Sequence, residues 1–218
     1  MLQRPSNEEE LQKREAIGVI RASRFVRRYA LSHKKINVET VYQIHKEIFK
    51  AAWPEIAGRN RQEELSITGS DLKLPHHTKV PELMNYLDVE LVKKVIELKE
   101  CEGHIITLNY EITEKAISCI EKVIHAASWL HHIITSVHPF REGNGRTARL
   151  AANLILERYG LVGISVKVEK ENKNQYRSAL VQIDKHKDYE PLDAIITEGI
   201  LDRYNGVSMK YYPQKGKR

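Results

Sequence analysis

The stretch HPFREGNGRTAR, residues 138–149, concentrates side chains and backbone features that could bind and transfer phosphate groups. Gly143 and Gly145 flank an asparagine and lead into a segment with helical periodicity. Glycine lets the backbone turn tightly and approach a ligand closely. The first turn of a helix then presents unpaired N–H groups and the positive end of the helix dipole. The stretch therefore predicts an anion-binding cradle at the start of a helix.

The side chains around this cradle are the types that phosphoryl or nucleotidyl transfer requires. Arg146 and Arg149 lie three residues apart, so both can point from one helix face toward phosphates. Glu142 has the wrong charge for direct phosphate contact, but Mg²⁺ binds a carboxylate together with phosphate oxygens. His138 can accept a proton near neutral pH. In such chemistry the protein mainly positions groups and stabilises charge.

The elements that must position these groups are predicted to be helices, which gives an all-α fold class. Ser6, Asn37 and Thr113 are expected helix N-caps. The expected helices span about residues 6–31, 37–53, 81–99, 113–137, 146–159, 171–185 and 191–204. The helix before the loop is apolar over a wide face and is expected at the centre of the fold. Residues 63–80 alternate polar and apolar around Gly69, which predicts a short β-hairpin flap.

The composition is that of an ordinary soluble globular protein, with 218 residues, 41% hydrophobic and 29% charged. No apolar run is long enough to span a bilayer and the first residues do not resemble a signal peptide, so we expect a cytoplasmic protein without a membrane partner. Cys101 and Cys119 are expected to be unclustered, reduced thiols. The net charge of +6 is compatible with an anionic partner, but at this modest excess a lysine-rich solvated surface is the better explanation.

The stretch matches every specified position of the signature His-Pro-Phe-x-[Asp/Glu]-Gly-Asn-Gly-Arg-x-x-Arg, and the chain thereby resembles the Fic (Fido) family. IHKEIFKAAWPEIAGRNR (44–61) is similar to the family's helix and AG-x-x-R segment, LSITG with LPHHTKVPELM to its flap, and QYRSAL to its post-motif helix. The resemblance implies a Fic helical bundle over 36–204. An N-terminal helical arm would occupy 1–35 and a basic flexible tail 205–218.

The resemblance also implies an activity, a protein adenylyltransferase that moves AMP from ATP to a Ser, Thr or Tyr hydroxyl of a target protein or of itself. His138 would be the catalytic base and Glu142 the Mg²⁺ ligand. Asn144 would hold the α-phosphate. The other phosphate ligands would be Gly143, Gly145, Arg146 and Arg149. Tyr176 would line the adenine pocket, and a flap strand of Ser66, Ile67, Thr68 and Gly69 would border the nucleotide and bind the target by strand addition.

Several alternatives stay open at this point. Gly145 stands where Doc-like kinases of the family have lysine, which favours nucleotidyl transfer over phosphate transfer. The motif does not fix the base, so transfer of UMP or phosphocholine is also compatible with it. A catalytically silent module that binds nucleotide or DNA is the remaining alternative, but no known DNA-binding motif supports a nucleic acid partner.

Regulation is predicted less directly. Many family members carry an inhibitory glutamate that pairs with the arginine equivalent to Arg149, and the partial matches here are Glu198 and Glu10. We expect both to have ordinary helix roles, with inhibition coming from a separate antitoxin-like polypeptide or from a neighbouring chain in a homo-oligomer. His131 is expected to face the core beneath the loop, and His76 and His77 are expected at the surface of the flap.

Overall fold

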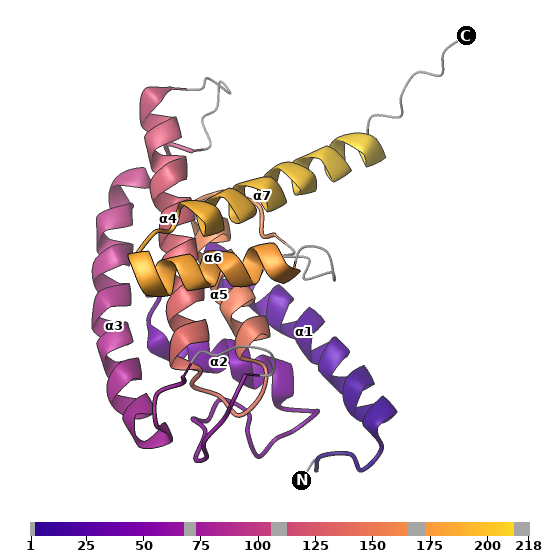
Figure 1. The fold of residues 1–218 in the computed structure, drawn as a ribbon. Coiled ribbons are helices and arrows are strands. Elements are labelled where there is room, and N and C mark those ends of the chain that lie inside the picture. Colours follow the sequence, from indigo (N-terminus) through magenta and orange to yellow (C-terminus); the bar gives the residue numbers. More distant parts are fainter. Residues whose placement is uncertain (1–2, 68–72, 106–112, 165–172, 212–218) are drawn as a thin grey trace.

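The computed structural model describes residues 3–67, 73–105, 113–164 and 173–211, which form a bundle of helices (Figure 1). The helices are α1 (Glu8–Leu31), α2 (Val38–Phe49), α3 (Val80–Glu97), α4 (Glu114–Val137), α5 (Asn144–Arg158), α6 (Lys173–His186) and α7 (Glu190–Tyr211), with the 3-10 turns η1 (His77–Lys79) and η2 (Leu98–Cys101). These ranges contain no β-strand, so the all-α prediction is confirmed. Among the described helices, none has both the length and the apolar character required to cross a bilayer.

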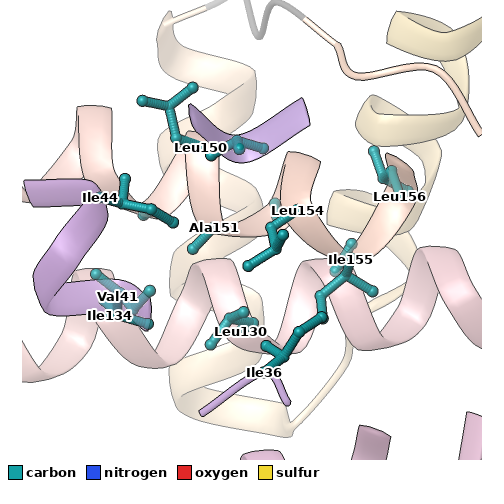
Figure 2. Packing of buried hydrophobic residues seen from close by; sticks show 14 of the residues in the cluster. Ile36, Val41, Ile44, Leu130, Ile134, Leu150, Ala151, Leu154, Ile155 and Leu156 are labelled. Carbon is teal, nitrogen blue, oxygen red and sulfur yellow. The ribbon is translucent and has the colours of Figure 1, made fainter. Parts of the chain in front are cut away.

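The centre of the bundle is α4, which packs against α3, α5 and α7 (Figure 1). Figure 2 shows Leu130 and Ile134 of α4 meeting Ala151 and Leu154 of α5 and Ile44 of α2. All five side chains are buried. Burying a large aliphatic side chain contributes about 1.5–3 kcal/mol, so this contact fixes the two helices that flank the loop.

Two of the three predicted N-caps are confirmed. The Asn37 side chain accepts a hydrogen bond from the Thr40 N–H at the start of α2. The Thr113 side chain accepts one from the Ala116 N–H at the start of α4. The Ser6 prediction is wrong, because α1 is capped by Asn7, whose Oδ1 accepts from the Glu9 N–H.

The predicted N-terminal arm, residues 1–35, packs directly on the bundle through α1. This helix contacts both α2 and α5. The approach to α2 is close, since a Cβ added to Gly18 would lie 1.9 Å from the Ile48 carbonyl oxygen. The two backbones can touch there only because residue 18 has no side chain. As a consequence, α1 reaches the start of α5.

The expected β-hairpin is not formed by the described residues of the flap, 61–67 and 73–79. Backbone carbonyls on its two legs are bound by the Arg61 side chain, which donates to the Glu63 and Pro75 oxygens, so a strand ladder is not what joins them. Residues 68–72, which include Thr68 and Gly69, lie outside the described part of the chain.

The C-terminal helix is longer than predicted. Expected over 191–204, α7 continues to Tyr211, which places the first residues of the predicted flexible tail in a helix. The rest of that tail, residues 212–218, lies outside the described residues.

The two cysteines are free and buried, but they are not separate as expected. The η2 turn packs on α4 and brings the thiols of Cys101 and Cys119 within hydrogen-bonding contact. Burial, the main cause, together with this contact raises the pKa of the Cys101 thiol to about 11. The Cys101 thiol is therefore protonated near neutral pH.

Candidate active site

The loop between α4 and α5 begins at His138, which has a left-handed backbone conformation. This residue caps α4 with φ 50° and ψ 57°, and its N–H still donates to the Ile134 carbonyl. Pro139 follows and cannot continue the helix. The chain therefore turns sharply, and it leaves the His138 side chain at the end of α4.

The middle of the loop is closed on itself by Asn144. Its Nδ2 donates to the Phe140 carbonyl at 2.7 Å, and its Oδ1 accepts from the Phe140 N–H at 2.9 Å. Phe140 is fully buried, as expected of the single apolar residue in the loop. Because the Asn144 amide closes the loop, its predicted contact with the α-phosphate depends on its backbone N–H and its second amide hydrogen.

A buried histidine, His45 of α2, supports the loop from beneath. Its ring stacks on Phe140 with centroids 3.8 Å apart and planes 5° apart. Its Nε2 bonds the Glu142 carbonyl at 3.0 Å, and its Nδ1 accepts the Gly58 N–H at 2.9 Å. Nδ1 can accept only in the neutral ring, and burial lowers the His45 pKa to about 4. The sequence signal for this residue is a polar side chain within the apolar face of residues 38–49, and it was missed.

We expect the free energy of unfolding to fall as the pH drops from about 6.5 toward 4, and His45 to cause part of this loss. Unfolded His45 gains a proton near 6.5, whereas folded His45 stays neutral to about 4, so the unfolded chain binds more protons in this window. At about 1.4 kcal/mol per pKa unit, this difference is worth about 3 kcal/mol.

Urea unfolding across this pH window, compared with the variant His45→Asn, measures the contribution. Asparagine cannot gain a proton, so the variant should lose less stability on acidification even if it is less stable at neutral pH. His131, whose pKa burial lowers to about 3, contributes equally to both proteins. Equal losses in the two proteins would contradict the assignment to His45.

Arg61 joins the loop to the flap, and only 2% of its surface is exposed. Its Nε donates to the His138 carbonyl at 2.8 Å, and its backbone N–H donates to the Pro139 carbonyl at 2.8 Å. Its two terminal nitrogens donate to the Glu63 and Pro75 carbonyls. Burial lowers the Arg61 pKa, but a guanidinium keeps its charge in proteins. Sequence reasoning assigned Arg61 no role beyond its place in the AG-x-x-R segment.

The His138 ring is held in the tautomer that a general base requires. Nδ1 lies 3.1 Å from the Thr135 carbonyl oxygen, and because a carbonyl only accepts, the hydrogen must be on Nδ1. Nε2 therefore carries the free lone pair. Burial, assisted by the Arg61 charge, lowers the His138 pKa against the opposing effects of the Thr135 hydrogen bond and Glu142. The ring is thus neutral near pH 7 and can accept a proton.

One pocket of about 450 Å³ collects the predicted loop residues. Its lining consists of Leu65, Ser66, His138, Arg141, Glu142, Gly143, Asn144, Gly145, Arg146 and Arg149. Every residue that was predicted between 138 and 149 therefore reaches the same space, together with Ser66 of the flap. Ile67, which was also predicted for the flap, is half-buried and does not line this pocket.

The floor of the pocket is the first turn of α5. The first intrahelical bond runs from the Thr147 N–H to the Gly143 carbonyl at 2.9 Å. Within the described residues, the N–H groups of Asn144, Gly145 and Arg146 therefore have no helical partner and can face an anion. Gly143 has φ 77°, a conformation that favours glycine.

The two predicted arginine clamps differ in their surroundings. Arg146 pairs with Glu142 at 3.2 Å and with Glu15 of α1 at 2.6 Å, and its guanidinium lies over the Phe49 ring. Arg149 is half-buried, and no carboxylate of the described residues pairs with it. Burial lowers its pKa. Arg149 is therefore a cation that lacks an anion, whereas a phosphate must share Arg146 with Glu15, a contact that sequence reasoning missed.

The other predicted residues lie near the pocket or away from it. The Tyr176 hydroxyl is 2.6 Å from Nε2 of the buried His131, and burial raises the Tyr176 pKa to about 12. Tyr176 is close enough to Arg149 to feel its charge, but it does not line the pocket, so its adenine role stays a prediction. Glu198 is exposed on α7 and Glu10 pairs with Arg14. Neither glutamate pairs with Arg149 within the described residues.

Known proteins are similar to this chain in sequence and in fold. The chain is 29% identical over 157 residues to protein adenylyltransferase fic-1 of Caenorhabditis elegans, which covers 71% of this chain and 26% of that protein. The structure of C. elegans Fic-1 (residues 134–508) superposes with a TM-score of 0.66 at 23% identity, over 94% of this chain and 54% of that one. The BepC protein of Bartonella tribocorum with bound AMPPNP superposes with a TM-score of 0.58 at 15% identity, over 89% and 88%.

The chain thus spans about a quarter of the length of its C. elegans relative. The sequence model of the Fic/DOC family matches residues 35–156, which is more than half of the chain and contains the entire loop with its pocket. The chain therefore belongs to the Fic/DOC family.

Proposed function

We propose that this chain is a protein adenylyltransferase, which transfers AMP from ATP to a Ser, Thr or Tyr hydroxyl of a target protein or of itself. The observation that carries this proposal is the single pocket in which Nε2 of His138, the open first turn of α5 and Arg149 meet, and no carboxylate of the described residues pairs with that arginine. The name of the C. elegans relative supports the reaction, and the AMPPNP in BepC supports an adenine nucleotide.

Each group in the pocket is assigned one role in the transfer reaction. The N–H groups at the start of α5 hold the phosphates, and Arg149 binds those farthest from the reacting atom. The target hydroxyl gives its proton to Nε2 of His138 while its oxygen attacks the α-phosphorus. The bond from that phosphorus to the bridging oxygen breaks, and pyrophosphate leaves. Tyr176 and the flap residues Ser66–Gly69 complete the proposal as adenine and target contacts.

Glu142 is suited to hold the Mg²⁺ of such a reaction. Its carboxylate is exposed at the pocket rim, and its Oε1 accepts from the Gly143 N–H and from Arg146. Its Oε2 has no protein partner within the described part of the chain. A single carboxylate oxygen beside a phosphate site is the environment that Mg²⁺ commonly uses. When bound there, the ion would neutralise phosphate charge.

We expect Arg149→Ala to weaken binding of a non-hydrolysable ATP analogue about 10–100-fold, since a hydrogen bond to a charged group contributes about 1.5–3 kcal/mol. Calorimetric titration gives the affinity. Arg141→Ala is the matched control, because Arg141 lines the same pocket but already pairs with Glu63 and covers Trp53. Equal weakening in the two variants would show that general charge, and not a clamp, explains the effect.

The decisive experiment follows the label from the nucleotide to protein. Lysate and purified protein are incubated with Mg²⁺ and ATP, GTP, CTP or UTP labelled at the α-phosphate, and the product is identified by mass spectrometry. Transfer of AMP supports the proposal. Label that comes only from γ-labelled ATP would indicate a kinase, and another α-label would indicate a different nucleotide. DNA binding that ignores ATP, with no transfer of label, would favour the regulatory alternative.

A cytoplasmic location, a separate antitoxin-like inhibitor and a homo-oligomer also belong to the proposal. Co-purification from the native host checks the inhibitor, and light scattering checks the oligomer.

A further inference from the structure

Outside the pocket, three potential metal ligands converge at the base of the flap. These are Glu64 on the outgoing leg and His76 and His77 on the returning leg. One ligand atom from each lies within 4.8 Å of the other two. No second group of three potential metal ligands lies this close together among the described residues. The sequence predicts the two histidines at the surface of the flap, within reach of the nucleotide or target, and predicts no metal site there.

The two distances from Glu64 to the histidine nitrogens are near those of a tetrahedral zinc site. With Zn–N and Zn–O bonds of about 2.0–2.1 Å, neighbouring ligand atoms lie about 3.3 Å apart. Nε2 of His76 is 3.4 Å from Oε1 of Glu64, which already fits. Nδ1 of His77 is 2.7 Å from the same oxygen, so this pair must open by about 0.6 Å, which small side-chain rotations allow.

Metal binding requires the histidine ligands to release the hydrogens on their ligand nitrogens, which is usual because ligands bind in the deprotonated form. The backbone N–H and the Nδ1–H of His77 both donate to Oε1 of Glu64, at 3.0 and 2.7 Å, so a metal ion would take the place of the Nδ1 hydrogen. Nδ1 of His76 lies 2.8 Å from the Thr78 hydroxyl. The same Nδ1 also accepts the Thr78 N–H at 3.4 Å, so metal binding through Nε2 requires the tautomer in which Nδ1–H donates to the hydroxyl. Metal-bound histidines usually donate their second N–H to such a partner.

The cluster lies at the base of the flap, where a bound metal ion would hold the two legs together. Arg61 already bonds the backbone of the two legs at Glu63 and Pro75, directly beside the cluster. Leu65 and Ser66, which follow Glu64, line the active-site pocket. A metal ion bound across the legs would therefore close a loop that contains the whole predicted target-binding strand.

We propose that Glu64, His76 and His77 form a binding site for a divalent transition-metal ion of the zinc type, which fixes the base of the flap. Imidazole nitrogens and one carboxylate suit zinc, whereas Mg²⁺ prefers oxygen ligands. This site is therefore separate in chemistry from the one at Glu142. The three protein ligands leave a fourth position for water or for a side chain of the bound target.

The test is a titration of the untagged, chelator-treated full chain with Zn²⁺, and with Co²⁺ for its visible spectrum. We expect one ion per chain and tetrahedral Co²⁺ bands. Loss of an outer partner costs about 10–100-fold in affinity, so Thr78→Val should fall in that range. Glu64→Gln and His77→Asn, which remove ligands, should cost at least about 100-fold.

The matched controls are Glu63→Gln, which changes the neighbouring carboxylate, and His104→Asn, which removes an exposed histidine elsewhere. Both should bind Zn²⁺ as the parent does. Hydrogen exchange over residues 61–67 and 73–79 should slow when Zn²⁺ is added, and only where Glu64 is intact. Zn²⁺ affinity that is unchanged in Glu64→Gln and His77→Asn would overturn the proposal, whatever the label-transfer experiment shows.

Discussion

The rate of AMP transfer should fall about 10²–10⁴-fold in the variant His138→Ala, which is the range that general base catalysis contributes. The Nδ1 hydrogen bond to Thr135 leaves Nε2 as the proton acceptor in the pocket. Affinity for the nucleotide should change little, since the phosphates are assigned to the start of α5 and to the arginines. Transfer of label from α-labelled ATP gives the rate, and calorimetric titration gives the affinity.

The same residue predicts the pH dependence of the reaction. The base works in its neutral form, and burial lowers the His138 pKa below 6.5, the ordinary value of a histidine. The rate should therefore rise with pH through a midpoint below 6.5 and be level at neutral pH. Residual transfer by His138→Ala should lack this rise.

Two results would contradict the role of His138. Transfer that persists at the parent rate in His138→Ala would exclude it as the base. Loss of nucleotide binding in step with loss of transfer would assign it to binding. His131→Asn does not serve as a control, because His131 is buried and bonds the Tyr176 hydroxyl. His125→Asn is suitable, since His125 is exposed on α4 and lies outside the pocket.

The parts that sequence predicted best are local in the chain. Asn37 and Thr113 cap their helices through N–H groups three residues away. The loop residues 138–149 share one pocket because a single turn between two helices brings them together. Nearest-neighbour chemistry decides such features, so a short pattern is sufficient to predict them.

The parts that sequence did not predict depend on contacts between distant residues. Arg61 reaches the His138 carbonyl, His45 supports the loop at Glu142, and Glu15 pairs with Arg146. Each partner comes from another element, and the packing of α1 and α2 on α5 decides which side chains meet. The described residues of the flap form no β-hairpin for the same reason, since alternation in sequence does not reveal that the buried Arg61 binds the Glu63 and Pro75 carbonyls.

Gly143→Ala should be the most damaging small substitution in the loop. Residue 143 has φ 77°, and an added Cβ would lie 2.3 Å from Cε2 of Phe49, a ring that is fully buried. The left-handed conformation costs a non-glycine residue about 1–2 kcal/mol, and overpacking a core adds about 1–3 kcal/mol. We expect a loss of about 2–5 kcal/mol in the free energy of unfolding from these terms, measured by urea denaturation.

Gly145→Ala is the matched control, two residues away in the same cradle. Its added Cβ would meet only the end of the Arg149 side chain, at 3.4 Å, and its φ is helical. Stability should stay within about 0.5 kcal/mol of the parent or rise slightly, since alanine is the better helix former. Nucleotide binding should weaken instead, because the methyl group enters the space beside Arg149. If Gly143→Ala were as stable as Gly145→Ala, the close contact with Phe49 would not be what shapes the cradle.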